Sequence, residues 1–369
     1  MLHGGEIYDK KIELDFSVSL NPLPCPAQVL DEIRAAADQV SNYPDIMQSE
    51  FAAAVAKAEN RLSLKEAKFT KENIVGGNGA SELLMAIVNM IRPRKALLPI
   101  PSFYGYEHVL KGRPDCEIIR YSLLKESDEP FAEDSFEITE QILNAVTGDI
   151  DLVILGNPNN PTGRLIPEGV LVKLMDRCRE VGAALIVDEC FYRLSDTGNF
   201  SGESVSAREY IGEFKDLFVV DAYTKLFSIP GVRVGFAITS EENAAKLRGF
   251  LPEWNMSVFA QMAGIKCAEI AGEGSFVKKS LEIIKREKAY LAKELEQMGI
   301  KTCKSDTNFL LIKNATDLYN ELLGMKIMIR DCSTFEGLQK GFYRIAIKDH
   351  ESNERLITAI KTLCNIRER

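Results

Sequence analysis

Residues 151–188, DLVILGNPNNPTGRLIPEGVLVKLMDRCREVGAALIVD, contain the pattern that decides the fold. An apolar run at 151–155 leads into a turn rich in proline and asparagine. A helix is predicted after Pro167, because apolar residues then recur at helical spacing until Gly182, a residue suited to ending a helix. A second apolar run follows at 183–188. The stretch therefore predicts two strands joined by a helix, the unit of a parallel sheet.

The same alternation of short apolar runs and amphipathic segments extends in both directions from this stretch. Seven strands are predicted, at residues 73–75, 95–98, 117–121, 151–155, 183–188, 217–221 and 232–238. Strands that alternate with helices favour a mostly parallel sheet covered by helices on both faces. The fold class is therefore α/β.

The C-terminal third has a different rhythm. A long helix is predicted at about 276–298, and three strand-like runs follow at 308–312, 325–329 and 341–347 among two further helices. Two more helices, at 28–39 and about 46–58, precede the alternating region. We therefore expect an N-terminal arm and small-domain segment at 1–40, a large domain at 41–245 and a smaller α+β domain at 246–369.

Composition narrows the class of protein. The 369 residues carry a net charge of −9 with no run of basic residues, which argues against a nucleic-acid partner. No stretch approaches the ~18 apolar residues of a membrane span, and residues 1–10 are too polar for a secretory leader, so we expect a cytoplasmic protein. The eight cysteines form no C-x-x-C pair, and no metal site is expected.

Four junctions between strands and helices carry polar groups at the edge where open α/β sheets bind ligands. Residues 76–82, GGNGASE, combine glycines with a predicted helix start, an arrangement that suits a phosphate but is also found in plain turns. Residues 157–163, NPNNPTG, would hold asparagine amides rigidly at a strand end. For residues 157–163 the alternative is an ordinary β-turn without a binding role.

The other two junctions place charges at strand ends. Asp188 ends the apolar run at 184–187, where a carboxylate needs a cation or strong donors, although for an aspartate taken alone a helix cap or a salt bridge is the commoner explanation. Lys225 follows the run at 217–221, and a lysine there has a lowered proton affinity and can attack an aldehyde. Arg233 can return to the same place to bind a phosphate. Together the four junctions describe pyridoxal 5′-phosphate.

The sequence resembles the fold-type I pyridoxal-phosphate aminotransferases of class I and II over nearly its whole length. The resemblance rests on residues 157–163 and on residues 224–235, TKLFSIPGVRVG, which match two elements of that family. It implies that Lys225 forms an imine with the cofactor, that Asp188 protonates the pyridine nitrogen and that Asn160 donates to the phenolate oxygen. It assigns five further cofactor contacts within one subunit to Gly79, Ala80, Phe103, Thr224 and Arg233. It also implies a homodimer in which Tyr43 reaches the cofactor of the neighbouring subunit.

Two subfamilies are similar to this chain: the threonine-phosphate decarboxylases of cobalamin biosynthesis and the histidinol-phosphate aminotransferases. The opening residues 3–5, HGG, the C-terminal stretches 329–332 and 343–347, and Phe191 in place of the tyrosine usual in aminotransferases favour the decarboxylases. The expected reaction is decarboxylation of O-phospho-L-threonine to (R)-1-amino-2-propanol O-phosphate. The aminotransferase reaction is the alternative.

The resemblance also implies where a small phosphorylated substrate binds. Arg344 would pair with the α-carboxylate and Arg330 with the phosphate, because a planar guanidinium binds either anion through two hydrogen bonds. His3 and Asn21 would complete the substrate site, although a terminal histidine can also be without fixed structure.

Two other classes of protein remain as alternatives. A dehydrogenase would use residues 76–79 as a dinucleotide loop, but Glu82 stands where the third glycine of that motif belongs, and Lys225 would have no role. A ligand-sensing module without turnover is the other alternative. The set of Lys225, Asp188, Asn160 and Arg233 favours an enzyme.

Overall fold

A computed structural model describes residues 4–8, 10–65, 68–124, 131–132, 135–196 and 206–367. All seven strands predicted between residues 73 and 238 are present in one sheet, in the order β2-β8-β7-β6-β5-β3-β4. β8 runs antiparallel to β2 and β7, and the other neighbouring pairs are parallel. The strand bounds are β2 Ile74–Asn78, β3 Lys95–Ile100, β4 Glu117–Ser122, β5 Leu152–Gly156, β6 Ala184–Asp188, β7 Leu217–Ala222 and β8 Val234–Ile238.

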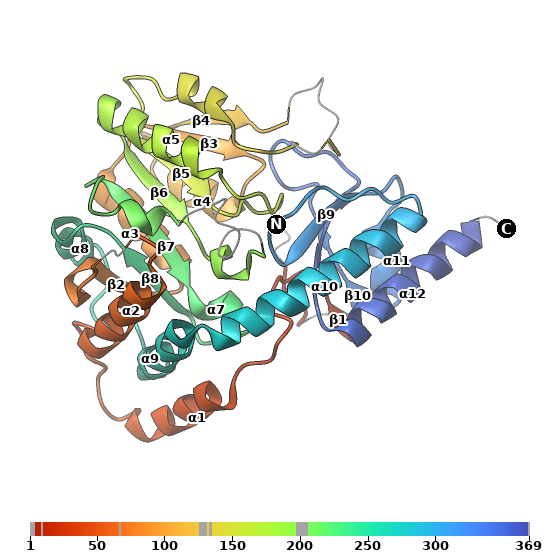
Figure 1. Cartoon of the computed structure of the whole chain (residues 1–369), viewed down its shortest axis with the longest axis horizontal. Helices are drawn as coiled ribbons and strands as arrows, with labels where there is room; N and C mark the ends of the chain where they lie inside the picture. The colour runs from red at the N-terminus through yellow and green to blue at the C-terminus, as the bar shows by residue number, and fades with distance from the viewer. Residues whose placement is uncertain are drawn as a thin grey trace.

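Helices cover both faces of this sheet (Figure 1). They are needed on both faces because successive strand residues point to opposite sides and are apolar on each side. Leu152 and Ile154 of β5 belong to an apolar core with α3, α4 and α8. Val153 and Leu155 point to the other face and belong to the core that contains α5. The helix bounds in this region are α2 Ser49–Leu62, α3 Ala80–Ile91, α4 Tyr104–Lys111, α5 Glu168–Val181, α7 Tyr223–Leu226 and α8 Glu241–Arg248.

The C-terminal part forms a second, smaller sheet. Its order is β11-β12-β9, with both pairings antiparallel. The bounds are β9 Phe309–Lys313, β11 Arg330–Asp331 and β12 Phe342–Ala346. The predicted strand at 325–329 is shorter and lies elsewhere, because β10 (Ile327–Met328) pairs in parallel with β1 (Leu14–Asp15). The N-terminal segment therefore lies against the C-terminal block.

Long helices connect the two sheets (Figure 1). The remaining elements are α1 Ala27–Ala36, α9 Val258–Glu273, α10 Ser275–Gln297, α11 Leu318–Gly324, α12 His350–Arg367 and the short 3-10 helices η1 Ala37–Gln39, η2 Lys71–Asn73, η3 Glu140–Ala145, η4 Tyr192–Leu194 and η5 Ala207–Tyr210. α9 buries mostly small residues, Ala260, Ala263, Gly264, Cys267, Ala268 and Ala271. No helix in the described ranges is long and apolar enough to span a bilayer.

Candidate active site

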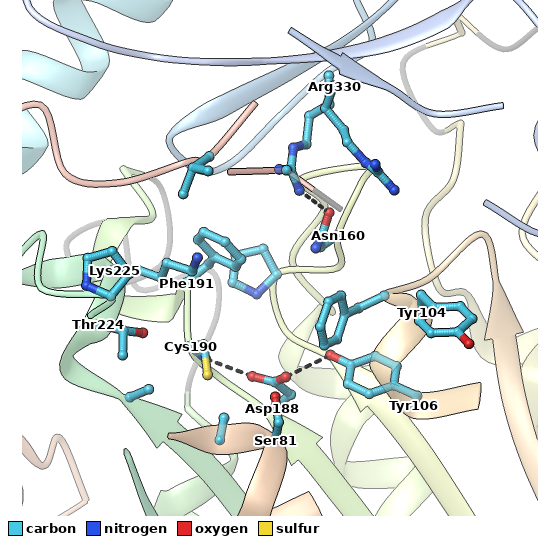
Figure 2. A pocket seen from close by; sticks show the side chains of 18 of the residues that line it. Ser81, Tyr104, Tyr106, Asn160, Asp188, Cys190, Phe191, Thr224, Lys225 and Arg330 are labelled. Carbon is cyan, nitrogen blue, oxygen red and sulfur yellow. Dashed lines mark hydrogen bonds between the residues drawn. The ribbon is translucent and has the colours of Figure 1, made fainter. Parts of the chain in front are cut away.

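A cavity of about 270 Å³ lies where the C-terminal ends of β6 and β7, the turn after β5 and the start of α3 meet the smaller sheet (Figure 2). Parallel strands all end at the same edge of a sheet, so residues far apart in sequence come together here. Nine of the residues predicted to form the site line this cavity: Ala80, Phe103, Asn160, Asp188, Thr224, Lys225, Arg233, Arg330 and Arg344.

Asp188 ends β6 at the floor of the cavity. Its carboxylate accepts hydrogen bonds from the Tyr106 hydroxyl at 2.9 Å and from the Cys190 backbone N–H at 3.0 Å. Burial raises the pKa of Asp188, and these donors oppose that rise only in part. Within the described residues Asp188 has no ion-pair partner, so a cationic N–H in the cavity would stabilise its charged form.

Lys225 belongs to α7, the single helical turn that follows β7. Burial, together with the nearby positive charge of Arg344, lowers the pKa of Lys225 to about 8. Its Nζ lies 5.9 Å from the centre of the Phe191 ring, and both residues line the cavity. An amine with this pKa is partly neutral near neutral pH and can therefore act as a nucleophile.

An anion cradle is formed where α3 begins. Gly79 precedes the first residue of the helix and has φ +78°, a conformation that glycine adopts without strain. A Cβ at Gly79 would lie 2.4 Å from Nη2 of Arg233, so the glycine lets this guanidinium approach the helix start. Thr224 and Ser81 also line the cavity. Free N–H groups at a helix start beside a guanidinium favour a phosphate.

Asn160 is held by the smaller sheet. Arg344 of β12 donates through Nη1 to Oδ1 of Asn160 and, at 2.7 Å, through Nη2 to the carbonyl oxygen of Ser17. With its oxygen turned toward Arg344, the amide N–H₂ of Asn160 remains available to donate to a ligand. The turn that carries Asn160 is fixed as well, since the N–H of Asn157 donates to the carbonyl of Asp188 at 2.8 Å.

Two buried guanidinium groups form the opposite wall. Arg330 of β11 and Arg344 are each 7% exposed, and burial lowers the pKa of Arg330 and lowers that of Arg344 to about 10. Arg330 donates to Thr334 Oγ1 at 3.2 Å, and Nε of Arg344 has no hydrogen-bond partner. Neither forms an ion pair with a carboxylate in the described part of the chain. Buried cations of this kind require an anionic partner, so this wall suits an anionic ligand.

Three of the predicted residues that the structure describes do not line the cavity. Gly79 lies next to the Arg233 guanidinium. Asn21 is buried, and its amide donates at 2.7 Å to both the Leu226 carbonyl and the Ser280 hydroxyl, so it supports the segment around Lys225. Tyr43 is exposed on the surface, with its ring centre 4.7 Å from that of Trp254. His3 lies outside the described residues.

Several lining residues could not be identified from sequence. Tyr106 and Tyr104 come from α4, and Cys190 follows Asp188 by two positions. Ser17 and Phe335 come from opposite ends of the chain. None of these belongs to a local motif. The nearest sequence signal is the aromatic cluster at 103–106, of which only Phe103 was predicted to belong to the site.

The donor set fits pyridoxal phosphate. A phosphate would lie at the start of α3 beside Arg233, a pyridinium N–H against Asp188, a phenolate oxygen near the Asn160 amide and an aldehyde within reach of Lys225. The orphaned Nε of Arg344 points to a further anion in the same cavity. These are the groups that the sequence predicted from the four junctions.

Comparison with known proteins supports this fit. Residues 11–360 match the family model described as aminotransferase class I and II. The chain is 30% identical to the threonine-phosphate decarboxylase of Salmonella typhimurium, with 98% of this chain and 96% of that protein covered.

Solved structures point to the same family. The histidinol-phosphate aminotransferase of Clostridium acetobutylicum is 32% identical, with 95% of this chain and 99% of that chain covered, and superposes with a TM-score of 0.82. The histidinol-phosphate aminotransferase of Sinorhizobium meliloti, solved in complex with pyridoxal 5′-phosphate, shares the fold with a TM-score of 0.79 at 17% identity, covering 96% of this chain and 91% of that chain. The chain therefore belongs to the aminotransferase class I and II family and is a pyridoxal-phosphate enzyme, either a decarboxylase or an aminotransferase.

Proposed function

We propose that Lys225 binds the cofactor covalently through its amine, that Asp188 holds the pyridine nitrogen in its protonated form and that the Asn160 amide donates to the phenolate oxygen. Ala80, Thr224 and Arg233, with the backbone of Gly79, would hold the phosphate, and Phe103 would lie against the ring. Burial supports these assignments, because it lowers the pKa of Lys225 and raises that of Asp188, so the amine is nucleophilic and the carboxylate requires a cation.

The reaction that we propose is decarboxylation of O-phospho-L-threonine to (R)-1-amino-2-propanol O-phosphate, a step of cobalamin biosynthesis. The observation that carries it is the pair of buried guanidinium groups, Arg330 and Arg344, on one wall of the cavity. This substrate has two anionic groups, a carboxylate and a phosphate, one for each arginine. Histidinol phosphate has only the phosphate and would leave one buried cation unpaired in that half of its reaction.

The residues would decide the outcome by orienting the substrate. Bound pyridoxal phosphate withdraws electrons from whichever Cα bond lies perpendicular to its ring. Arg344 is fixed by Asn160 and Ser17, so a carboxylate paired with it has a defined direction, and Arg330 would fix the phosphate end. Carbon dioxide would leave if these residues held the Cα–carboxylate bond perpendicular to that ring, and a proton from the site would then take its place at Cα.

Transamination of histidinol phosphate with 2-oxoglutarate is the second candidate. The identity of 32% to a histidinol-phosphate aminotransferase favours it, and the two carboxylates of 2-oxoglutarate could also occupy both arginines. Phe191 argues against it, because a hydroxyl at this position would support the phenolate in an aminotransferase, whereas Phe191 packs edge-on against Phe309 with ring centres 5.2 Å apart.

Two assays on the same holoenzyme separate the candidates. With O-phospho-L-threonine alone, a decarboxylase releases one carbon dioxide for each substrate consumed. With histidinol phosphate and 2-oxoglutarate, an aminotransferase forms glutamate. We expect carbon dioxide release at least 100-fold faster than glutamate formation, and the reverse ratio would assign the chain to the aminotransferases.

We further propose that two copies of the chain form a dimer with shared active sites. Tyr43 is 80% exposed and lies beside Trp254, at a surface position from which it could reach a neighbouring site. Light scattering should give about twice the mass of one chain. Tyr43→Ala should weaken cofactor binding in the dimer, whereas unchanged cofactor affinity would remove Tyr43 from the site. The cytoplasmic location stays a prediction.

A further inference from the structure

A buried ion cluster lies beside the strand ends that carry Asp188 and lead to Lys225. It consists of Glu59 of α2, Glu189 just after β6, Arg193 of η4, Arg208 of η5 and Asp221 of β7. All five residues are less than 10% exposed, and the three carboxylate residues are almost completely buried. None of the five lines the cavity, so none can touch the cofactor or the substrate directly.

Arg208 has a different place in this cluster from Arg193. Its Nη2 donates to Glu189 Oε2 at 2.9 Å and to Asp221 Oδ2 at 3.2 Å, and its Nη1 donates to Glu59. Arg193 also donates to Glu59, and its Nε lies 3.5 Å from Asp221 Oδ2. Arg193 makes no ion pair with Glu189 in the described structure. Arg208 is therefore the arginine that joins the end of β6 to β7.

The two carboxylates that Arg208 joins adjoin the site in sequence. Glu189 directly follows Asp188, the last residue of β6. Asp221 lies in β7, four residues before Lys225 of α7. Glu189 also accepts from the backbone N–H of Ala207 at 2.8 Å and from the Asn157 amide at 3.4 Å. The strand ends that carry Asp188, Lys225 and the Asn160 turn thus meet around Glu189 and Arg208.

The balance of charge makes this cluster sensitive to the loss of one arginine. Three carboxylates face two guanidinium groups, and water cannot compensate a buried excess of negative charge. Burial raises the pKa of Asp221 to about 6 in spite of both arginines. Without Arg208, Glu189 and Asp221 would be two buried carboxylates with no side-chain bridge between them, and only the backbone hydrogen bonds between β6 and β7 would hold the two strand ends together.

We propose that Arg208 is a positioning residue that sets the spacing of Asp188 and Lys225 around the cofactor ring, through Glu189 and Asp221. The proposal rests on the cofactor roles of Asp188 and Lys225 proposed above. Its consequence is that Arg208 controls how firmly Asp188 is held against the pyridine nitrogen. A looser contact between Asp188 and the pyridine nitrogen makes the ring less electron-withdrawing. The pKa of the linkage between Lys225 and the cofactor then rises, so this linkage keeps its proton to higher pH.

The test compares Arg208→Met with Arg193→Met in the holoenzyme without substrate. Both variants remove one buried guanidinium from the same cluster, but only the first breaks the bridge to Glu189. The visible absorbance of the bound cofactor is titrated with pH, and cofactor affinity and thermal stability are measured alongside. We expect Arg208→Met to raise the absorbance midpoint by about one pH unit and to weaken cofactor binding about tenfold, which corresponds to about 1.4 kcal/mol. In Arg193→Met the midpoint should move by less than a third as much.

Equal shifts in the two variants would contradict the proposal, because they would reflect charge or general destabilisation. An unchanged midpoint in Arg208→Met would contradict it as well. If Arg208→Met yields no folded protein, Arg208→Lys against Arg193→Lys decides, and a wild-type midpoint in Arg208→Lys then overturns the proposal. Failure of the proposed cofactor roles is recognised separately, since wild-type protein would then show no visible band that borohydride bleaches.

Discussion

Arg330 and Arg344 lie directly opposite each other on the antiparallel strands β11 and β12, with both guanidinium groups at the cavity. Residues 332–341 connect the two strands and include Phe335, whose ring centre lies 5.2 Å from the Arg330 guanidinium. Two buried cations without carboxylate partners in the described chain would be costly unless a ligand pairs with them. This pair is the structural basis of the proposed doubly anionic substrate.

Arg330→Gln should raise the KM for O-phospho-L-threonine at least 100-fold, about 2.7 kcal/mol, because a charge-assisted pair with the phosphate is lost. Arg344→Lys, which keeps the charge but loses the planar fork and the hold on Asn160, should lower kcat as well. Steady-state kinetics of both variants check this. A wild-type KM in Arg330→Gln would remove that arginine from the substrate site.

Phe191→Tyr should lower the pH midpoint of the visible cofactor band by about one unit. A hydroxyl on this ring, which faces Lys225 in the cavity, would donate to the phenolate oxygen and stabilise the form that has lost its proton. Absorbance titration of the holoenzyme measures the midpoint. An upward shift, or none in a folded variant, would show that position 191 does not face the phenolate.

Gly79→Ala should weaken cofactor binding at least tenfold while the protein stays folded. The added Cβ would collide with the Arg233 guanidinium and would sit on a residue with φ +78°. Equilibrium titration with pyridoxal phosphate checks the affinity. Gly212→Ala is a suitable control, since a Cβ there meets no atom within 4 Å. Equal affinities in the two variants would contradict the cradle.

The rate at which the apoprotein takes up pyridoxal phosphate should rise with pH through a midpoint near 8. Burial lowers the pKa of Lys225 from 10.5 to about 8, and only the neutral amine attacks the aldehyde. Between pH 8 and 10.5 the unfolded chain binds this proton and the folded chain does not. The free energy of unfolding therefore rises with pH across that window. Arg344→Met should move the midpoint upward, because a neighbouring positive charge is removed. A midpoint near 10.5 in wild type would show that Lys225 is not buried as described.

Much of the large sheet could be predicted because each of its strands is an apolar run followed by a turn. All seven predicted strands are present, and Asp188 and Lys225 lie at the cavity because parallel strands end at one edge. Sequence was less informative about α9, whose small buried residues form no clear apolar stripe. The strand predicted at 325–329 is reduced to β10 (Ile327–Met328), because these two residues pair with the distant β1.

The remaining parts of the site depend on contacts that no local pattern encodes. The hydrogen bond between Arg344 and Asn160 joins residues 184 positions apart, and Tyr106 reaches Asp188 from a different helix. Asn21 is a case in which sequence does not show which contacts a polar side chain makes. It was expected beside the substrate, but its polar side chain is used to hold the segments of Leu226 and Ser280. A buried asparagine has the same sequence signature in either role.

The measurement that most directly tests the central claim uses O-phospho-L-threonine labelled with deuterium at Cα. Decarboxylation breaks the bond to the carboxylate and leaves the Cα–D bond intact, whereas transamination removes the deuteron first. Mass spectrometry of the product should therefore show 1-amino-2-propanol phosphate that retains the deuterium and has gained one proton from water. A product that keeps its carboxylate and has lost the deuterium would contradict the account and identify the protein as an aminotransferase.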